Sequence, residues 1–411
     1  MTRANSSGSG SMRRHELRTR NARMEHEQTR RSAPAHPDQR ALAEVFTSVS
    51  LLGPPMSDTL LELVCHLFSP EEAAVARYLP FYLPKPIETI AHRARTRPEE
   101  IREIVLRLAE RRVIYSNSRG YALLPLIPGM FEYLLMDGRD TPWHRRYAQL
   151  IVDLFGTGYS SRYNTSPSPL IRTIPIQTAV EEESRVVDAD LMSEMIACHH
   201  RLAVLNVCQC RQSLLFVGHE CSRSNPQDGC LVFGSFAEST VESGSGRFVS
   251  REEMRDIVQE RWEKNLVFMS ANLVPSSSNA ICTCCDCCCH YLESINSFKG
   301  RMSLAPPLFL IQVDESSCTS CGKCVKVCNT HAHTIEDRVH RYNHEHCIGC
   351  GLCVTACPAH VITVAENPGY RPPSKSWLHH GLRILPGSVL SAMKIKLTSS
   401  FESVKAGRKK P

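Results

Sequence analysis

The 411-residue sequence predicts an α+β protein built from three successive units. Three observations predict it: helical apolar spacing followed by a short hairpin near the N-terminus, apolar runs that each precede a cysteine block in the middle, and a duplicated cysteine motif near the C-terminus. A chain of this length has room for about two to four units with their own cores. It contains no run near the roughly eighteen apolar residues of a membrane span, so we expect none.

The N-terminal tail accounts for almost all of the excess positive charge. The formal net charge is +6, and residues 1–40 alone hold nine arginines and four acidic residues. Because these residues are rich in Ser, Gly and Arg and poor in apolar side chains, we expect a disordered basic tail at 1–45 and a second basic tail at 367–411. The charge is therefore weak evidence for nucleic-acid binding by a folded surface.

The first unit is predicted at residues 46–136. A helix starts at Ser69-Pro70, a second covers 87–94, and a longer third helix covers 98–111. A hairpin that turns at 117–120 follows. This order of elements is typical of a winged helix, so we predict a winged-helix-like domain.

The third helix of this unit is the candidate for reading DNA. With its flanks it carries five Arg and four Glu, which dilutes the positive field that phosphate binding needs. We therefore favour a docking or packing module and keep DNA binding as an alternative. Residues 137–190 are predicted to be a helical connector, in which the helix 143–155 has an apolar core face.

The central unit, residues 191–305, is predicted to be a cysteine-rich α/β domain. A buried strand at 201–207 precedes Cys208 and Cys210, which would leave its end on the same side. A second apolar run, 266–269, precedes six cysteines within 282–289. The predicted metal ligands of this unit are Cys208, Cys210, Cys221, Cys230, Cys282, Cys284, Cys285, Cys287 and Cys288.

The block at 282–289 cannot face one metal as a whole, because adjacent side chains point apart in any regular backbone. Leaving all its thiols unligated would expose an easily oxidised surface, so some should meet the thiols of 208–230 at a shared site. A structural zinc site and a further iron-sulfur cluster both fit thiolate-only ligation. We favour the cluster, because the C-terminal motif already requires cluster assembly. Arg211 either donates to such a centre or is a surface arginine.

The C-terminal unit contains one cysteine motif twice. Residues 318–328 read CTSCGKCVKVC and residues 347–358 read CIGCGLCVTACP, with a constant offset of 29 residues. Each is C-x2-C-x2-C-x3-C, in which three cysteines offer thiolates to one cubane and the fourth ligates the other cluster. The predicted ligands are Cys318, Cys321, Cys324 and Cys357 for one cluster, and Cys347, Cys350, Cys353 and Cys328 for the second. A single zinc ion instead requires two C-x2-C pairs with a long spacer.

With this motif, residues 308–366 resemble a bacterial-type ferredoxin that carries two [4Fe-4S] clusters. The resemblance implies one-electron transfer and a short strand and helix in each half; the domain is predicted at 306–366. Asn329 stands where the second motif has Pro358, and we expect it to loosen that loop. With the central CQCR, CLVFG and CTCCDCC stretches, residues 54–365 resemble multidomain 4Fe-4S proteins common in anaerobic prokaryotes.

Five histidines surround the ferredoxin loops: His331, His333, His340, His344 and His346. We favour solvated histidines on a cysteine-rich surface. The alternative is an imidazole close enough to a cluster to couple its charge to pH.

These features predict an iron-sulfur electron-transfer protein in the reducing cytoplasm, either a carrier or a subunit of an oxidoreductase. Clustered cysteines at metal-ligand spacing argue against a secreted disulfide scaffold. The alternatives are a redox-sensing iron-sulfur transcription regulator that acts through the winged-helix-like unit, and a reductase with an open cluster. The sequence contains no nucleotide-binding or hydrolase motif that would indicate another activity.

Overall fold

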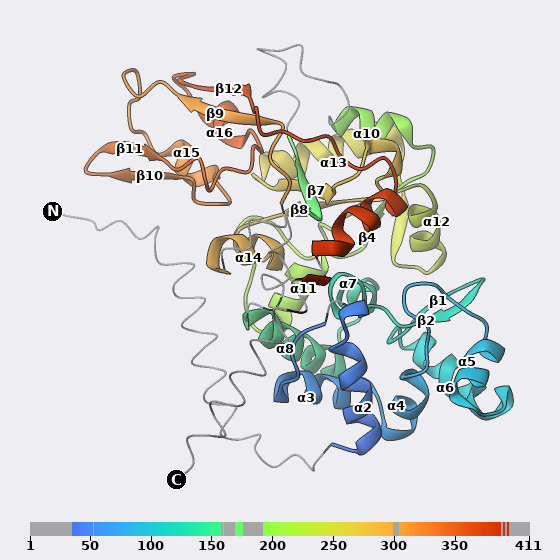
Figure 1. Cartoon of the computed structure of the whole chain (residues 1–411). Helices are drawn as coiled ribbons and strands as arrows, with labels where there is room; N and C mark the ends of the chain where they lie inside the picture. The colour runs from blue at the N-terminus through green and yellow to red at the C-terminus, as the bar shows by residue number, and fades with distance from the viewer. Residues whose placement is uncertain are drawn as a thin grey trace, which may run out of the picture.

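The computed structural model describes residues 35–51, 53–157, 159, 169–175, 192–298, 304–387, 389, 390 and 393. Helices and strands are mixed along these ranges, consistent with the predicted α+β class (Figure 1). Residues 1–34 of the predicted N-terminal tail and residues 394–411 of the predicted C-terminal tail lie outside the described residues. Among the helices described, none is long and apolar enough to cross a membrane.

The N-terminal part is a set of helices followed by a hairpin, drawn in blue to cyan in Figure 1. Its elements are α2 (Pro37–Phe46), α3 (Asp58–Leu67), α4 (Pro70–Ala76), α5 (Ile87–Ala94), α6 (Pro98–Glu110), β1 (Tyr115–Asn117) and β2 (Gly120–Ala122). The Ser69 hydroxyl accepts from the Glu72 N–H and the Glu72 carboxylate accepts from the Ser69 N–H, which confirms the predicted helix start. The helices at 70–76, 87–94 and 98–110 and the hairpin are as predicted, whereas their identity as a winged helix stays a prediction. The expectation of a disordered tail over all of 1–45 is wrong for α2, because Leu42, Ala43 and Phe46 are fully buried in the core of this part.

The predicted connector shares the core of these helices. α8 (Pro142–Gly156) buries Tyr147 and Ile151 in the same apolar cluster as Leu63 of α3. α7 (Phe131–Leu135) adds Phe131, which packs edge-on against a phenyl ring of α8. The connector helix α8 is thus part of the first unit's core, because its apolar side chains pack against those of α3.

The central part is built on a six-stranded sheet in the order β3-β7-β8-β5-β4-β6. The strands are β3 (Ile171–Ile174), β4 (Leu202–Leu205), β5 (Leu231–Phe233), β6 (Gly246–Phe248), β7 (Val267–Ala271) and β8 (Ala280–Cys284). Every neighbouring pair is antiparallel, so the prediction of an α/β unit is wrong in this respect. β3 lies within the predicted helical connector and was not foreseen.

Five helices accompany the sheet: α10 (Met192–Cys198), α11 (Gln209–Phe216), α12 (Gly234–Glu242), α13 (Arg251–Glu263) and α14 (His290–Phe298). α12 packs on β4 and β5, and α10 packs on α13. α11 packs on α8 of the N-terminal part, so the segment that follows β4 joins the two parts.

The C-terminal part contains β9 (Phe309–Val313), α15 (Lys323–Val327), β10 (His333–Glu336), β11 (Val339–Tyr342), α16 (Leu352–Ala356) and β12 (Ile362–Glu366). β9 and β12 pair antiparallel with Ile311 opposite Val364, and α15 packs on α16. This arrangement gives each half a strand and a short helix, as predicted. Its apolar side chains join those of the central sheet in one buried cluster.

The chain after β12 does not simply leave the molecule. Ser374 is fully buried, donates its N–H to the Asn272 carbonyl (3.0 Å) and accepts at its own carbonyl from the Val274 N–H (3.0 Å). His380 is buried as well. The first part of the predicted C-terminal tail is therefore bound beside β7.

Candidate functional site

The first predicted ligand set lies around one cavity of the C-terminal part. Cys318, Cys321, Cys324 and Cys357 all line it, although Cys357 comes from the second motif. The loop turns at Gly322, whose φ of 75° is in the left-handed region, and α15 starts directly after it. Tight turning in the loop thus brings three thiols to one side, and the packing of α16 on α15 brings the fourth.

The second predicted set gathers in the complementary way. Burial raises the pKa of the Cys350 thiol, and the nearby thiols of Cys328 and Cys347 raise it further. The pKa of the Cys353 thiol is raised by burial and then by the thiols of Cys350, Cys347, Cys328 and Cys324. Cys328 comes from the first motif. The Ala332 N–H donates to Cys328 Sγ (3.2 Å) and the Gly349 N–H donates to Cys347 Sγ (3.4 Å).

Both sets fit the donor chemistry of a [4Fe-4S] cluster. Each offers four thiols and each includes one thiol from the other motif, which is the donor pattern of two-cluster ferredoxins. Backbone N–H donors to ligand sulfur stabilise the thiolate form and tune the potential of a bound cluster.

Two of the five predicted histidines lie at the first set. His333 and His340 are buried, with 2.9 Å between His333 Nδ1 and His340 Nε2, and their ring nitrogens lie within 4.8 Å of Cys324 Sγ. Burial lowers the pKa of His333 to about 4, so this ring stays neutral near pH 7, and burial also lowers the pKa of His340. His331, His344 and His346 are exposed. The solvated interpretation is therefore right for three histidines and wrong for two.

Asn329 directly follows Cys328, a member of the second predicted ligand set, and connects this loop to the central part. It is 1% exposed; its Oδ1 accepts from the Asp286 N–H (3.0 Å) and its Nδ2 donates to the Asn265 carbonyl (2.9 Å). Its own carbonyl accepts from Asn296 Nδ2 (3.0 Å). The expectation of a looser loop is wrong, because an amide side chain replaces the missing proline ring with bonds to another part of the chain.

Comparison with known proteins agrees with this geometry. Residues 311–364 match the 4Fe-4S dicluster domain family. The chain therefore carries a 4Fe-4S dicluster domain near its C-terminus. It is also similar to the NADP-reducing hydrogenase subunit HndD of Solidesulfovibrio fructosivorans, with 27% identity over 144 residues. The similarity covers 34% of this chain and 23% of that protein, so the chain spans about a quarter of its relative.

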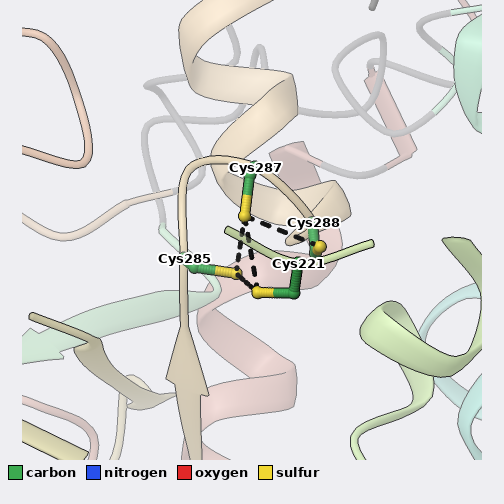
Figure 2. A group of neighbouring side chains, drawn as sticks. All are labelled: Cys221, Cys285, Cys287 and Cys288. Atoms are coloured by element: carbon green, nitrogen blue, oxygen red, sulfur yellow. Dashed lines mark hydrogen bonds between the residues drawn. The ribbon is translucent and has the colours of Figure 1, made fainter. Parts of the chain in front are cut away.

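Outside the dicluster domain, four central thiols converge on one point. The four-thiol group consists of Cys221, Cys285, Cys287 and Cys288 (Figure 2). Its sulfur separations are 3.5 Å for Cys221–Cys287, 3.6 Å for Cys221–Cys285 and Cys285–Cys287, and 3.7 Å for Cys287–Cys288. All four sulfurs lie within 4.8 Å of one another.

The four-thiol group is assembled from two segments. Cys285, Cys287 and Cys288 belong to the turn between β8 and α14, and Cys221 belongs to the loop after α11. Arg223 ties the segments together, because its guanidinium donates to both carboxylate oxygens of Asp286 (2.7 and 3.1 Å). The adjacent Cys287 and Cys288 both join the group, against expectation, because a turn does not alternate its side chains as a strand does.

The other six central thiols form a separate six-thiol group of Cys208, Cys210, Cys230, Cys282, Cys284 and Cys289. Cys282 and Cys284 share a face of β8, where Cys282 interacts with Cys230 and Cys284 interacts with Cys289. Cys289 also interacts with Cys210. The sequence-based set omitted Cys289, although its place in the block was visible.

Cys208 and Cys210 do not leave the end of a strand as predicted. β4 ends at Leu205, and Cys208 is the residue directly before α11. They nevertheless face the same group, because the first helical turn places residues two apart near one end of the helix. The two blocks of cysteines do lie together, since Cys221 Sγ is 3.6 Å from Cys285 Sγ and 3.5 Å from Cys287 Sγ, whereas a shared metal site stays a prediction.

Arg211 lies between the two thiol groups. It is 1% exposed and donates to the carbonyls of Asp228 (3.0 Å) and Thr283 (2.6 Å). Burial alone would lower its pKa, but the facing thiols of Cys208 and Cys285 raise it well above the usual range. The surface-arginine interpretation is wrong; Arg211 is a fixed positive charge beside both groups.

The helix that was the candidate for DNA contact has its arginines paired. In α6, Arg102 Nη2 lies 3.7 Å from Glu88 Oε1, and Arg107 Nη2 lies 3.8 Å from Glu71 Oε2. Directly before the helix, Arg97 Nε lies 2.6 Å from Glu100 Oε1. These carboxylates offset the positive charge that phosphate contacts require. Just after the helix, Arg112 donates to the central part at the Ser243 carbonyl and the Ser245 hydroxyl. These contacts fit a packing module.

Proposed function

We propose that this protein is an electron-transfer protein that holds two [4Fe-4S] clusters in its dicluster domain and serves as a carrier or subunit for an oxidoreductase. The bound clusters supply one-electron redox chemistry at low potential. The observation that carries the proposal is the crossed arrangement of thiols, in which Cys357 lines the cavity of Cys318, Cys321 and Cys324. A hydrogenase subunit among the similar proteins agrees with an oxidoreductase partner.

The exposure of the ligands gives the two cluster positions different roles. Cys321 is exposed, whereas Cys347 and Cys353 are buried and Cys350 is half-buried. A partner can therefore approach the Cys318–Cys321–Cys324 position most closely. The second position lies toward the central part, because Cys328 is followed by Asn329, which bonds to Asp286 between two thiols of the four-thiol group.

The residues around the clusters limit what else can react. Val361 and Ile362 cover the first cavity with apolar side chains. The buried His333, whose pKa burial lowers to about 4, stays neutral beside it. Apolar cover of this kind restricts water at the ligands and helps to set the potential. The cysteines gather in groups that can hold metal, which agrees with a reducing compartment such as the cytoplasm.

Anaerobic redox titration of the full chain tests the proposal. The purified chain should contain iron and sulfide sufficient for the dicluster domain, about eight iron atoms. It should take up electrons reversibly at low potential, seen as bleaching of the visible band and the appearance of EPR signals from reduced clusters. A chain that binds iron and sulfide but is not reduced reversibly by dithionite contradicts the electron-transfer role.

The partner is tested separately. Reduced chain should pass electrons to an oxidoreductase from the same cell faster than the chain with Cys321→Ser, which alters the exposed ligand. The matched control is Cys198→Ser, since Cys198 is equally exposed but lies in α10, outside both motifs. Equal transfer rates for all three chains contradict electron exit to the partner at the exposed cluster position.

A further inference from the structure

We propose that the four-thiol group binds a single zinc ion in a closed tetrahedral site that is distinct from the clusters of the dicluster domain. Its neighbouring sulfurs lie between 3.5 and 3.7 Å apart. Four thiolates at the usual zinc–sulfur distance of about 2.3 Å stand at the corners of a tetrahedron with edges of about 3.8 Å. The side chains therefore already have the spacing that one ion requires.

An iron-sulfur cubane does not fit the same four sulfurs. In a cubane each thiolate binds a different iron at a corner of the cluster, so the thiolates are separated by the whole cluster as well as by two iron–sulfur bonds. Sulfurs that all lie within 4.8 Å of one another are too close for that arrangement. The sequence favoured a further iron-sulfur cluster among the central cysteines. For these four thiols we propose zinc instead.

The surroundings of the group are those of a structural site. Cys285 and Cys288 are buried in the apolar cluster that contains α3 and α8, and Cys221 and Cys287 pack against it. A closed four-thiolate site leaves no position for a substrate, and such sites contribute directly to folding. The ion would fasten the loop of Cys221 to the turn before α14 within the core.

A buried arginine, Arg211, offsets part of the charge of the site. A zinc ion with four thiolates retains two negative charges, which a buried site must offset. Arg211 faces Cys285 and Cys221 from within the protein, and Arg223 holds Asp286 next to the turn. His219 adds a contact of its Nε2 to the Cys287 carbonyl (3.0 Å). These contacts hold the ligand loops in the geometry that binds the ion.

The site would also position the dicluster domain. Asp286 stands between two ligands and donates its N–H to Asn329, and Arg223 donates to the Lys326 carbonyl (3.2 Å). Both contacts reach the segment of Cys328, a predicted cluster ligand. The zinc ion thus lies at the junction of the N-terminal helices, the central sheet and the dicluster domain.

The metal content of full-length chains purified without oxygen tests the proposal. Wild-type protein should carry about one zinc ion per chain, with an X-ray absorption spectrum of four sulfurs at about 2.3 Å. Cys221→Ser should lose most of that zinc while its iron and sulfide content is unchanged. Cys230→Ser, in the six-thiol group, and Cys198→Ser, outside both groups, should keep the zinc.

Cobalt provides a readout that does not depend on the stability of a variant. Wild-type chain grown with Co²⁺ should show the intense visible bands of a tetrahedral thiolate-bound ion, and added zinc should abolish them. Three results would overturn the proposal: a wild-type chain without zinc, a zinc shell that contains nitrogen or oxygen, or loss of iron in place of zinc in Cys221→Ser. Loss of electron transfer with zinc intact would instead count against the proposed function.

Discussion

Replacing Asn329 by alanine should loosen the dicluster domain from the central part. The change removes three side-chain hydrogen bonds, to the Asp286 N–H and to the carbonyls of Asn265 and Val327. Each such bond contributes about 1 kcal/mol to the free energy of unfolding, and buried partners left unpaired cost more. The substitution should therefore lower the free energy of unfolding by about 3 kcal/mol or slightly more. For a cooperative unit of about 150–250 residues this lowers the melting temperature by about 6–12 °C.

The assay is anaerobic thermal melting of the metal-loaded full chain, followed by circular dichroism and by the cluster absorbance. The matched control is Asn343→Ala, because Asn343 is exposed and its side chain accepts only a local bond from the Glu345 N–H. That variant should melt close to wild type. Asn329→Pro should be destabilised at least as much as Asn329→Ala, even though it restores the residue of the second motif. If Asn329→Ala melts together with Asn343→Ala, the contact does not join the two parts.

Three other substitutions test contacts elsewhere in the molecule. Burial raises the pKa of Glu132 to about 7, so the stability it contributes below about pH 4.5 is lost as the pH rises through 7. Glu132→Gln should remove this loss, which amounts to at most about 3 kcal/mol, and denaturant midpoints measured from about pH 5 to 8 check it; parallel pH profiles contradict it. Arg211→Met removes the buried charge beside both thiol groups and should lower the free energy of unfolding by about 3–5 kcal/mol. Arg211→Lys should not restore this stability, because an ammonium cannot reproduce the guanidinium contacts. An Arg211→Met chain as stable as wild type would contradict the role of Arg211 as a charge that stabilises the thiol groups. Ser69→Ala breaks the capping box with Glu72 and should cost about 1 kcal/mol, whereas Ser69→Asp should keep most of the stability in the same denaturation assay.

Features fixed by local spacing were predictable from the sequence. The C-x2-C-x2-C-x3-C motif dictates a tight loop followed by a short helix, so the gathering of three thiols per motif was foreseen. The helix expected at 98–111 is observed at 98–110, because its apolar residues repeat with a helical period. The apolar run at 266–269 overlaps the strand at 267–271, and a strand expected in the ferredoxin unit lies at 309–313.

Features that depend on distant partners were not predictable. The division of ten central thiols into groups of four and six depends on the turn before α14 and on a loop 64 residues earlier. β3 is a four-residue edge strand with too short a pattern to detect. The sequence predicted that Asn329 would loosen its loop, because its partners Asp286 and Asn265 lie far away in the sequence and could not be foreseen.

The central claim is that the two motifs bind their clusters crosswise, and EPR of reduced ligand variants tests it most directly. Cys318→Ser and Cys357→Ser belong to different motifs but to one cavity, so both should alter the same cluster signal. Cys328→Ser should alter the other signal. If Cys357→Ser instead changes the signal that responds to Cys347→Ser and leaves that of Cys318→Ser intact, each motif holds its own cluster and the account is contradicted.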